Sequence, residues 1–165
     1  CSHGHGDHNA AGEVKIIPAA NSFDTELIHT FHDPEGGRLR GTNDIMIIKS
    51  EGRRYVHMGD IGCDPGDEAI GKIRNCDVLF IPVGGFFTID HKEAMELIQK
   101  INPKITVPMH FRGKTFGYDV IAESGDFIRD AVASGKYKMI NDGESVIDTS
   151  VLAAGTIVIL KPLRS

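Results

Sequence analysis

The sequence predicts a mixed α/β domain, and three observations lead to this prediction. Short runs rich in Val and Ile recur along the chain and are bounded by Gly, Pro, Asn or Asp, which is typical of strands. Other segments place apolar residues at helical spacing. The strand-like runs come first and then alternate with the helical segments, which indicates one mixed sheet with helices packed on it.

The predicted elements follow in chain order. Glu51 and Gly52 separate two of the apolar runs, which predicts a hairpin there. Helices are expected over 67–75, 90–101 and 126–134. Asp90 followed by Glu93 resembles a capping box, so the second helix should begin near Asp90. The runs expected to form strands are 14–17, 45–48, 55–58, 78–83, 105–108 and 156–160.

Composition limits the classes of partner. With 165 residues and no visible linker or repeat, residues 1–165 are expected to form a single domain. The formal net charge of -5 argues against broad attraction to nucleic acid or to an anionic membrane, and no apolar run is long enough to span a bilayer. The odd number of cysteines, without zinc-ribbon spacing, predicts reduced thiols and a cytoplasmic location.

The stretch "SHGHGDH", residues 2–8, concentrates groups that bind metals. His3 and His5 point the same way if the segment is extended, so they can reach one ion together. A glycine then lets the chain turn, so Asp7 and His8 can face a second ion. Imidazole with carboxylate suits Zn²⁺, Mn²⁺ or Fe. The alternatives are an affinity tag, which would be a plain His run, and an adventitious chelate between an N-terminal amine at Cys1 and His3.

A two-metal site needs more ligands than one loop supplies, and three strand ends offer them. His32 follows an apolar stretch in "LIHTFHDPEGG", Asp60 lies in "YVHMGDIG", and His110 ends "ITVPMH". Side chains just past buried strands are commonly aimed into a site. Taken alone, each His is more often structural; together with residues 2–8, a joint metal site is favoured.

The HxHxDH loop, a distant His, a Gly-Asp after a strand and a late strand-terminal His together resemble the metallo-β-lactamase fold superfamily. "FHDPEGGRLRGTNDIMII", "IPVGGFFTIDHKEAMELI" and "ITVPMHF" are similar to its branch of Zn-dependent hydrolases related to L-ascorbate-6-phosphate lactonase. The resemblance covers most of 2–112 and is looser over 113–165. It implies an α/β domain of the α+β type, an αββα sandwich. Part of the first sheet would precede Cys1, and residues 1–165 would fold stably only with it.

The resemblance also implies a dinuclear site with two divalent ions, Zn²⁺ first, with Mn or Fe as alternatives. In that family pattern the first ion is bound by His3, His5 and His32, the second by Asp7, His8 and His110, and Asp60 bridges both. His29 does not match a family position and is expected at the surface or in a structural role. His57 and His91 have no implied role.

The function that follows is a metal-dependent hydrolase, in which a metal-bridging hydroxide attacks a small, anionic ester or lactone. Asp7 and Asp60 are the expected catalytic residues, with Asp7 orienting the nucleophile or taking up a proton. Activity should fall below about pH 6, because metal-binding imidazoles must be deprotonated. The alternatives are a phosphodiesterase or nuclease of the same fold and a non-catalytic metal-binding protein.

The substrate contacts are less sharply predicted. Arg112 and Lys114 follow His110 and could bind a phosphate or carboxylate, or belong to a solvated loop. Phe86 or Phe87 could line a pocket, although one of the two is expected in the core. Arg38 and Arg40 after His32 carry the same ambiguity as Arg112. The expected partner is a small-molecule substrate, and self-association is compatible with the family pattern.

Overall fold

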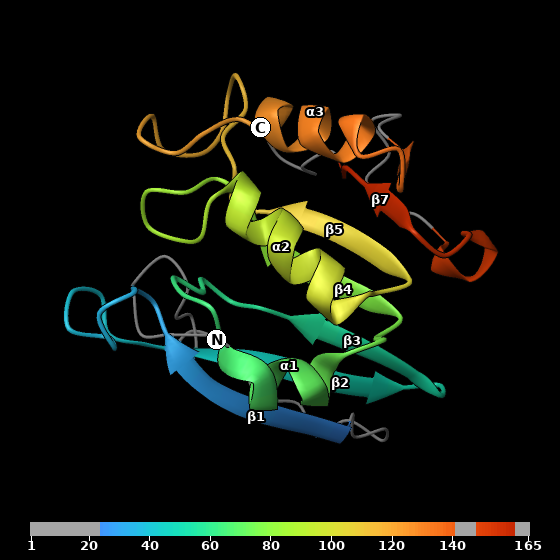
Figure 1. Ribbon diagram of the computed structural model, residues 1–165, viewed down its shortest axis with the longest axis horizontal. Helices are drawn as coiled ribbons and strands as arrows, with labels where there is room; N and C mark the ends of the chain where they lie inside the picture. Colours follow the sequence, from blue (N-terminus) through green and yellow to red (C-terminus); the bar gives the residue numbers. More distant parts are fainter. Residues whose placement is uncertain (1–23, 141–147, 161–165) are drawn as a thin grey trace, which may run out of the picture.

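The computed structural model describes residues 24–140 and 148–160. In this part a seven-stranded sheet has the strand order β1-β2-β3-β4-β5-β7-β6 (Figure 1). The predicted strand at 14–17 lies outside the described residues. The elements are β1 (Asp24–Phe31), β2 (Thr42–Ser50), β3 (Arg53–His57), α1 (Gly66–Ile73), β4 (Val78–Pro82), α2 (His91–Ile101), β5 (Ile105–Met109), α3 (Gly125–Ala133), β6 (Lys138–Ile140), the 3-10 helix η1 (Thr149–Val151) and β7 (Thr156–Val158).

The directions of the strands bring three predicted site residues to one edge. β1 is antiparallel to β2, and β2 is antiparallel to β3, so β1 and β3 run the same way. β3, β4 and β5 are mutually parallel. The carboxyl ends of β1, β3 and β5 therefore meet at one edge of the sheet, on the left in Figure 1. His32, Asp60 and His110 follow these ends.

The hairpin between β2 and β3 is confirmed. Ser50 pairs with Arg53, and the two residues between them, Glu51 and Gly52, have φ of 51° and 73°. Two consecutive positive φ values are typical of the type I′ turn, whose twist matches that of the paired strands. Glycine adopts this conformation readily, whereas Glu51 does so at a cost.

The three helices cover one face of the sheet. Leu79 and Ile81 on β4 pack with Ile98 of α2 and Phe127 of α3 in the larger buried cluster. The alternate residue Val78 faces the other way and joins a smaller cluster with residues of β5 and β7. The mixed α/β prediction is confirmed, and the described residues form one sheet-and-helix half of the expected αββα arrangement.

The predicted capping box of α2 is present. Asp90 Oδ1 accepts the backbone N–H groups of Lys92 and Glu93, at 2.8 and 3.0 Å. The Glu93 carboxylate in turn accepts the N–H of Asp90 at 2.8 Å. The helix ends at Asn102, which has a left-handed φ of 53°. All three predicted helices exist, with bounds shifted by one or two residues.

Two strands lie outside the ranges expected to form strands: β6, and β1, of which the sequence indicated only the apolar stretch before His32. Among the described strands β1 lies at the edge of the sheet, and most of its side chains are exposed, so it lacks the continuous apolar run that marked the other strands. β6 has only three residues.

Cys63 and Cys76 are free thiols, as predicted, and Cys1 lies outside the described residues. Within the described ranges no helix is both long and apolar enough to cross a membrane.

Candidate metal site at the ends of β1, β3 and β5

Three of the predicted ligands converge on one carboxylate oxygen. His32 directly follows β1, His110 directly follows β5, and Asp60 lies three residues past β3. Asp60 Oδ2 is 3.6 Å from His32 Nε2 and 3.5 Å from His110 Nε2. The side chains of His32, Asp60 and His110 are only 2%, 8% and 15% exposed. A carboxylate oxygen thus lies between two imidazoles in a shielded position.

These distances fit ligands of a metal ion. Both N···O distances exceed the roughly 2.7–3.2 Å of an ordinary N–H···O hydrogen bond. Two ligands bound about 2 Å from one tetrahedral ion lie about 3.3 Å apart, close to the observed separations. Imidazole and carboxylate are donors that Zn²⁺, Mn²⁺ and Fe accept. The residues present therefore fit a divalent metal.

The described residues do not complete such a site alone. Within 24–140 and 148–160, no three His, Cys, Asp or Glu side chains form a group that could hold an ion unaided. The other four predicted ligands, His3, His5, Asp7 and His8, lie outside the described residues, so their part in the site stays a prediction. Further ligands are needed from outside these ranges.

Two glycines let neighbouring loops press against the backbone of the histidines. A Cβ on Gly62 would lie 2.4 Å from the carbonyl oxygen of His32. A Cβ on Gly84 would lie 2.1 Å from the carbonyl oxygen of His110. Real Cβ atoms do not come this close, so only glycine allows the loops after β3 and β4 to seat His32 and His110 as they do.

Asn43 is a site residue that sequence reasoning missed. It is fully buried on β2, and its Oδ1 accepts the backbone N–H of Asp60 at 2.8 Å. Its Nδ2 donates to the carbonyl of Met58 at 2.9 Å and to Thr30 Oγ1 at 3.0 Å. One amide therefore holds both ends of the short turn that carries Asp60. The available signal was an Asn at the start of the apolar run "NDIMII".

Replacing Asn43 by Ala should destabilise the protein by about 2–4 kcal/mol, because the N–H of Asp60 and the carbonyl of Met58 would both lose a buried partner. Urea unfolding measures this loss. Thr30→Val is the matched comparison, since it removes both hydrogen bonds between Thr30 and Asn43 and leaves the bond of Asn43 to Asp60 intact. We expect Thr30→Val to cost clearly less, and equal losses would contradict the role assigned to the Asn43–Asp60 bond.

Asp33 organises the loop that follows His32, and it was also missed. Its fully buried carboxylate accepts the N–H groups of Glu35, Gly37, Leu39 and Arg40 at 2.7–3.0 Å. Burial acts to raise the pKa of Asp33, but these four N–H donors outweigh it and hold the pKa below its usual value. The charged carboxylate thereby fixes the path of 34–41. The Asp-Pro-Glu-Gly-Gly pattern was the available signal for such a turn.

The predicted substrate contacts fall on exposed loops. Arg112 is engaged within its own loop, because Nε donates to the carbonyl of Ile121 and Nη1 pairs with Glu123, both at 3.0 Å. Lys114 is exposed on the same loop. Phe86 is 61% exposed and Phe87 is half-buried, so the expectation that one of them belongs to the core is wrong.

The remaining described histidines have other partners. His29 is exposed and its Nδ1 lies 2.5 Å from Asp44 Oδ1, which confirms the expected surface position. His91 Nδ1 lies 2.8 Å from Asp130 Oδ2 and links α2 to α3. His57 Nδ1 accepts the N–H of Gly59 at 3.1 Å, in the turn before Asp60.

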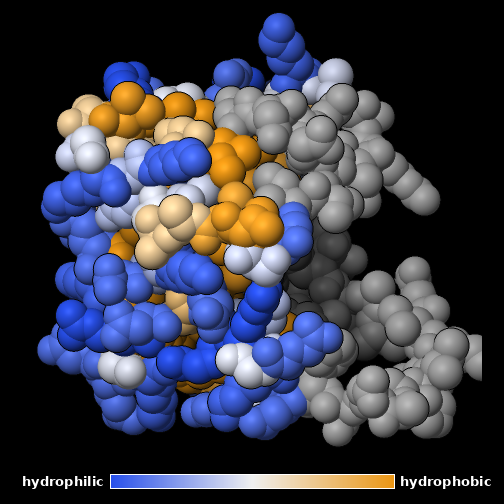
Figure 2. All heavy atoms as spheres, turned by 90° about the vertical axis from the view of Figure 1, so that its right-hand side faces the viewer, coloured by the Kyte–Doolittle hydropathy of each residue, from blue (hydrophilic) through white to orange (hydrophobic). Residues whose placement is uncertain are grey.

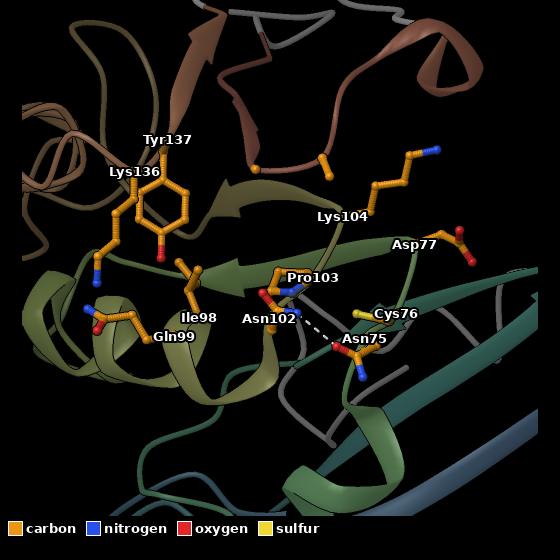
Figure 3. A pocket seen from close by; sticks show the side chains of 12 residues that line it. Asn75, Cys76, Asp77, Ile98, Gln99, Asn102, Pro103, Lys104, Lys136 and Tyr137 are labelled. Carbon is orange, nitrogen blue, oxygen red and sulfur yellow. Dashed lines mark hydrogen bonds between the residues drawn. The ribbon is translucent and has the colours of Figure 1, made fainter.

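A cavity lies at the opposite edge of the sheet. Its volume is about 660 Å³, and it lies beside residues that precede parallel strands, such as Asp77, Lys104 and Gly155 (Figure 3). Asn75 and Asn102 form a 2.9 Å hydrogen bond along one side. This side of the molecule shows mostly hydrophilic residues among its described atoms (Figure 2). The cavity has no histidine among its lining residues, so the metal-binding chemistry belongs to the other edge.

Residues 1–110 match the model of the β-lactamase superfamily domain, a span that contains His32, Asp60 and His110. The chain belongs to this superfamily. The fold agrees, since a proposed Zn-dependent hydrolase of the metallo-β-lactamase superfamily from Thermotoga maritima superposes with a TM-score of 0.66. At 24% identity, that alignment covers 97% of this chain and 80% of the other. The resemblance predicted from the sequence is therefore confirmed, as is the fold class.

Curated members of the superfamily are also similar to this chain. A protein from Enterococcus faecalis is 28% identical over 138 residues, which are 82% of this chain and 55% of that protein. One from Pelotomaculum thermopropionicum is 30% identical over 148 residues, 84% of this chain and 64% of that protein. Both are named UPF0173 metal-dependent hydrolases. The chain thus spans between about half and two thirds of these relatives' length.

Proposed function

We propose that this protein is a metal-dependent hydrolase of the β-lactamase superfamily. The observation that carries the proposal is the near-equal separation of Asp60 Oδ2 from His32 Nε2 and His110 Nε2, at 3.6 and 3.5 Å. A carboxylate that bridged two ions, each also bound by one of these imidazoles, would have one oxygen close to both rings in this way. The names of the curated relatives support the same class of reaction.

Asp60 would bridge two divalent ions, Zn²⁺ first, and Mn or Fe otherwise. His32 would bind one ion with His3 and His5, and His110 the other with Asp7 and His8. Bound ions of this kind make hydroxide available near pH 7 and polarise the bond to be cleaved.

The chain's own residues prepare this site. Asn43 fixes the backbone that carries Asp60, and Gly62 and Gly84 let the flanking loops seat the two histidines. Burial of His32 and Asp60 excludes water that would weaken their interaction with a charge. Asp7 would orient the nucleophile or take up a proton.

The proposed substrate is a small anionic ester or lactone. Lys114 is the better candidate for the anion on the loop after His110, since Arg112 already pairs with Glu123. Nucleic acid is disfavoured by the net charge of -5.

Elemental analysis of the purified protein, combined with a panel of esters, lactones and phosphodiesters, tests the proposal. We expect about two equivalents of Zn, Mn or Fe and hydrolysis of esters or lactones that a chelator abolishes. One equivalent would contradict the bridging role of Asp60 but not the reaction class. Metal-loaded protein that cleaves only bis-p-nitrophenyl phosphate would favour the phosphodiesterase, and one that cleaves nothing would favour a binding protein.

A further inference from the structure

Three aromatic rings and a guanidinium form a cluster that we call the aromatic rim: Phe86, Phe87, Tyr118 and Arg40. The rings of Phe86 and Phe87 meet edge to face with centroids 4.7 Å apart, and Phe87 meets Tyr118 at 6.3 Å. Arg40 Cζ lies 5.8 Å from the centroid of Phe87, within cation–π range. The rim therefore combines apolar ring faces with one positive charge.

The members of the rim belong to loops that also carry or contact the candidate metal ligands. Arg40 lies on the loop after His32, and Tyr118 lies on the loop after His110. The loop that carries Phe86 and Phe87 is fastened on both sides.

On one side of that loop, Ile89 N–H donates to the carbonyl of Ile61, next to Asp60, at 2.9 Å. On the other side, Gly84 packs on the His110 carbonyl and accepts the N–H of Ala122 at 2.8 Å. The rings thus stand on a loop held between Asp60 and His110.

Packing among residues 24–140 and 148–160 does not explain the rim. Phe86 and Tyr118 are 61% and 60% exposed, and Leu39 and Val120 on the same loops are each 53% exposed. Phe86 also has a φ of 62°, which is strained for a bulky side chain and is typical of residues that clamp ligands. Among the described residues, no carboxylate pairs with the Arg40 guanidinium, so its charge is available to a ligand.

We propose that the aromatic rim binds an aryl or alkyl group of the substrate and that Arg40 binds a negative charge next to that group. The substrate class is then an amphiphilic ester or lactone with an apolar substituent and an anion. The hydrolysis of such a substrate rests on the proposed function, whereas its binding to the rim does not.

Fluorescence titration of the metal-loaded protein with 2-naphthalenesulfonate tests the binding step, because a sulfonate is a weak metal ligand. We expect Phe86→Ala to raise the Kd about tenfold. A change of this size corresponds to losing roughly half of the free energy that burial of a Phe side chain provides. Arg40→Gln should weaken binding of the sulfonate but not of neutral 2-naphthalenemethanol. Leu27→Ala and Arg129→Gln are matched controls on β1 and α3, and both should leave the Kd unchanged.

Outcomes separate this inference from the proposed function. The proposal that the rim binds substrate would be overturned if the wild-type protein did not bind the sulfonate. It would also be overturned if Phe86→Ala and Arg40→Gln bound the sulfonate normally, whatever their hydrolytic activity. If binding depended on both residues but the protein hydrolysed no ester or lactone, the rim would remain a binding site and the proposed hydrolase function would be rejected. If both hold, Phe86→Ala should raise KM for p-nitrophenyl hexanoate more than for p-nitrophenyl acetate.

Discussion

Replacing Asp60 by Asn should remove most of the bound metal and lower hydrolysis by at least about 100-fold. The substitution keeps the size of the side chain but removes its charge, and Oδ2 is the atom that faces both His32 and His110. Loss of residues that merely support metal ligands already costs about 10–100-fold in metal affinity or activity, so loss of a bridging ligand should cost more. Elemental analysis after dialysis, with circular dichroism to check folding, measures the effect.

Asp64→Asn is the matched control for this experiment. Asp64 lies four residues farther along the same loop, but its carboxylate is half-exposed and pairs with Lys100 at 2.7 Å. An exposed pair of this kind contributes little to stability, about 0–1 kcal/mol. Asp64→Asn should therefore retain its metal and activity. Unchanged metal content in Asp60→Asn would reject Asp60 as a ligand, and equal losses in both variants would point to general damage to the loop.

The convergence of His32, Asp60 and His110 could be predicted because the motifs around them resemble one family, and because sequence patterns mark the strands before Asp60 and His110. The strand before His110 is a short, buried apolar run bounded by turn residues, and the strand before Asp60 carries the strand-forming pair Tyr55 and Val56. The start of α2 could be predicted because a capping box is local and depends on residues three positions apart. Such features depend on neighbours in the chain.

The features that escaped prediction depend on contacts between distant segments. Asn43 supports Asp60 across 17 positions, and Arg112 pairs with Glu123 only because the loop between them closes. The exposure of Phe86 follows from the left-handed turn at 85–86, which neither phenylalanine signals by its type. β1 escaped because an exposed edge strand needs no apolar alternation. The residue type of a metal ligand can be recognised from the sequence, whereas the tertiary contacts that hold and surround that ligand cannot.

Gly84→Ala should lower both stability and metal affinity, although it adds a single methyl group. The backbone of Gly84 does not have the left-handed φ that disfavours alanine, so the effect comes from contact alone. The new Cβ would lie 2.1 Å from the carbonyl oxygen of His110 and 3.3 Å from the Cα of Phe111. These are backbone atoms, so His110 itself must shift. Overpacking of this kind costs about 1–3 kcal/mol.

Gly71→Ala provides the opposite expectation for the same chemical change. Gly71 lies within α1, and a Cβ there would meet nothing within 4 Å. Alanine should therefore stabilise the helix by up to about 1 kcal/mol, and metal affinity should not change. Urea unfolding and competition with a chelating dye measure the two quantities for both variants. If Gly84→Ala behaved like Gly71→Ala, the loop after β4 would not be what seats His110.

The direction in which His110 would shift in Gly84→Ala explains why metal affinity should fall along with stability. His110 has a φ of 52°, a conformation that a non-glycine residue keeps only when its surroundings impose it. Gly84 is one such constraint, since it packs directly on the His110 carbonyl. A methyl group at this contact would push the peptide away and let His110 relax toward negative φ. Its ring would then leave the position 3.5 Å from Asp60, so the change in metal affinity should exceed what the loss of stability alone predicts.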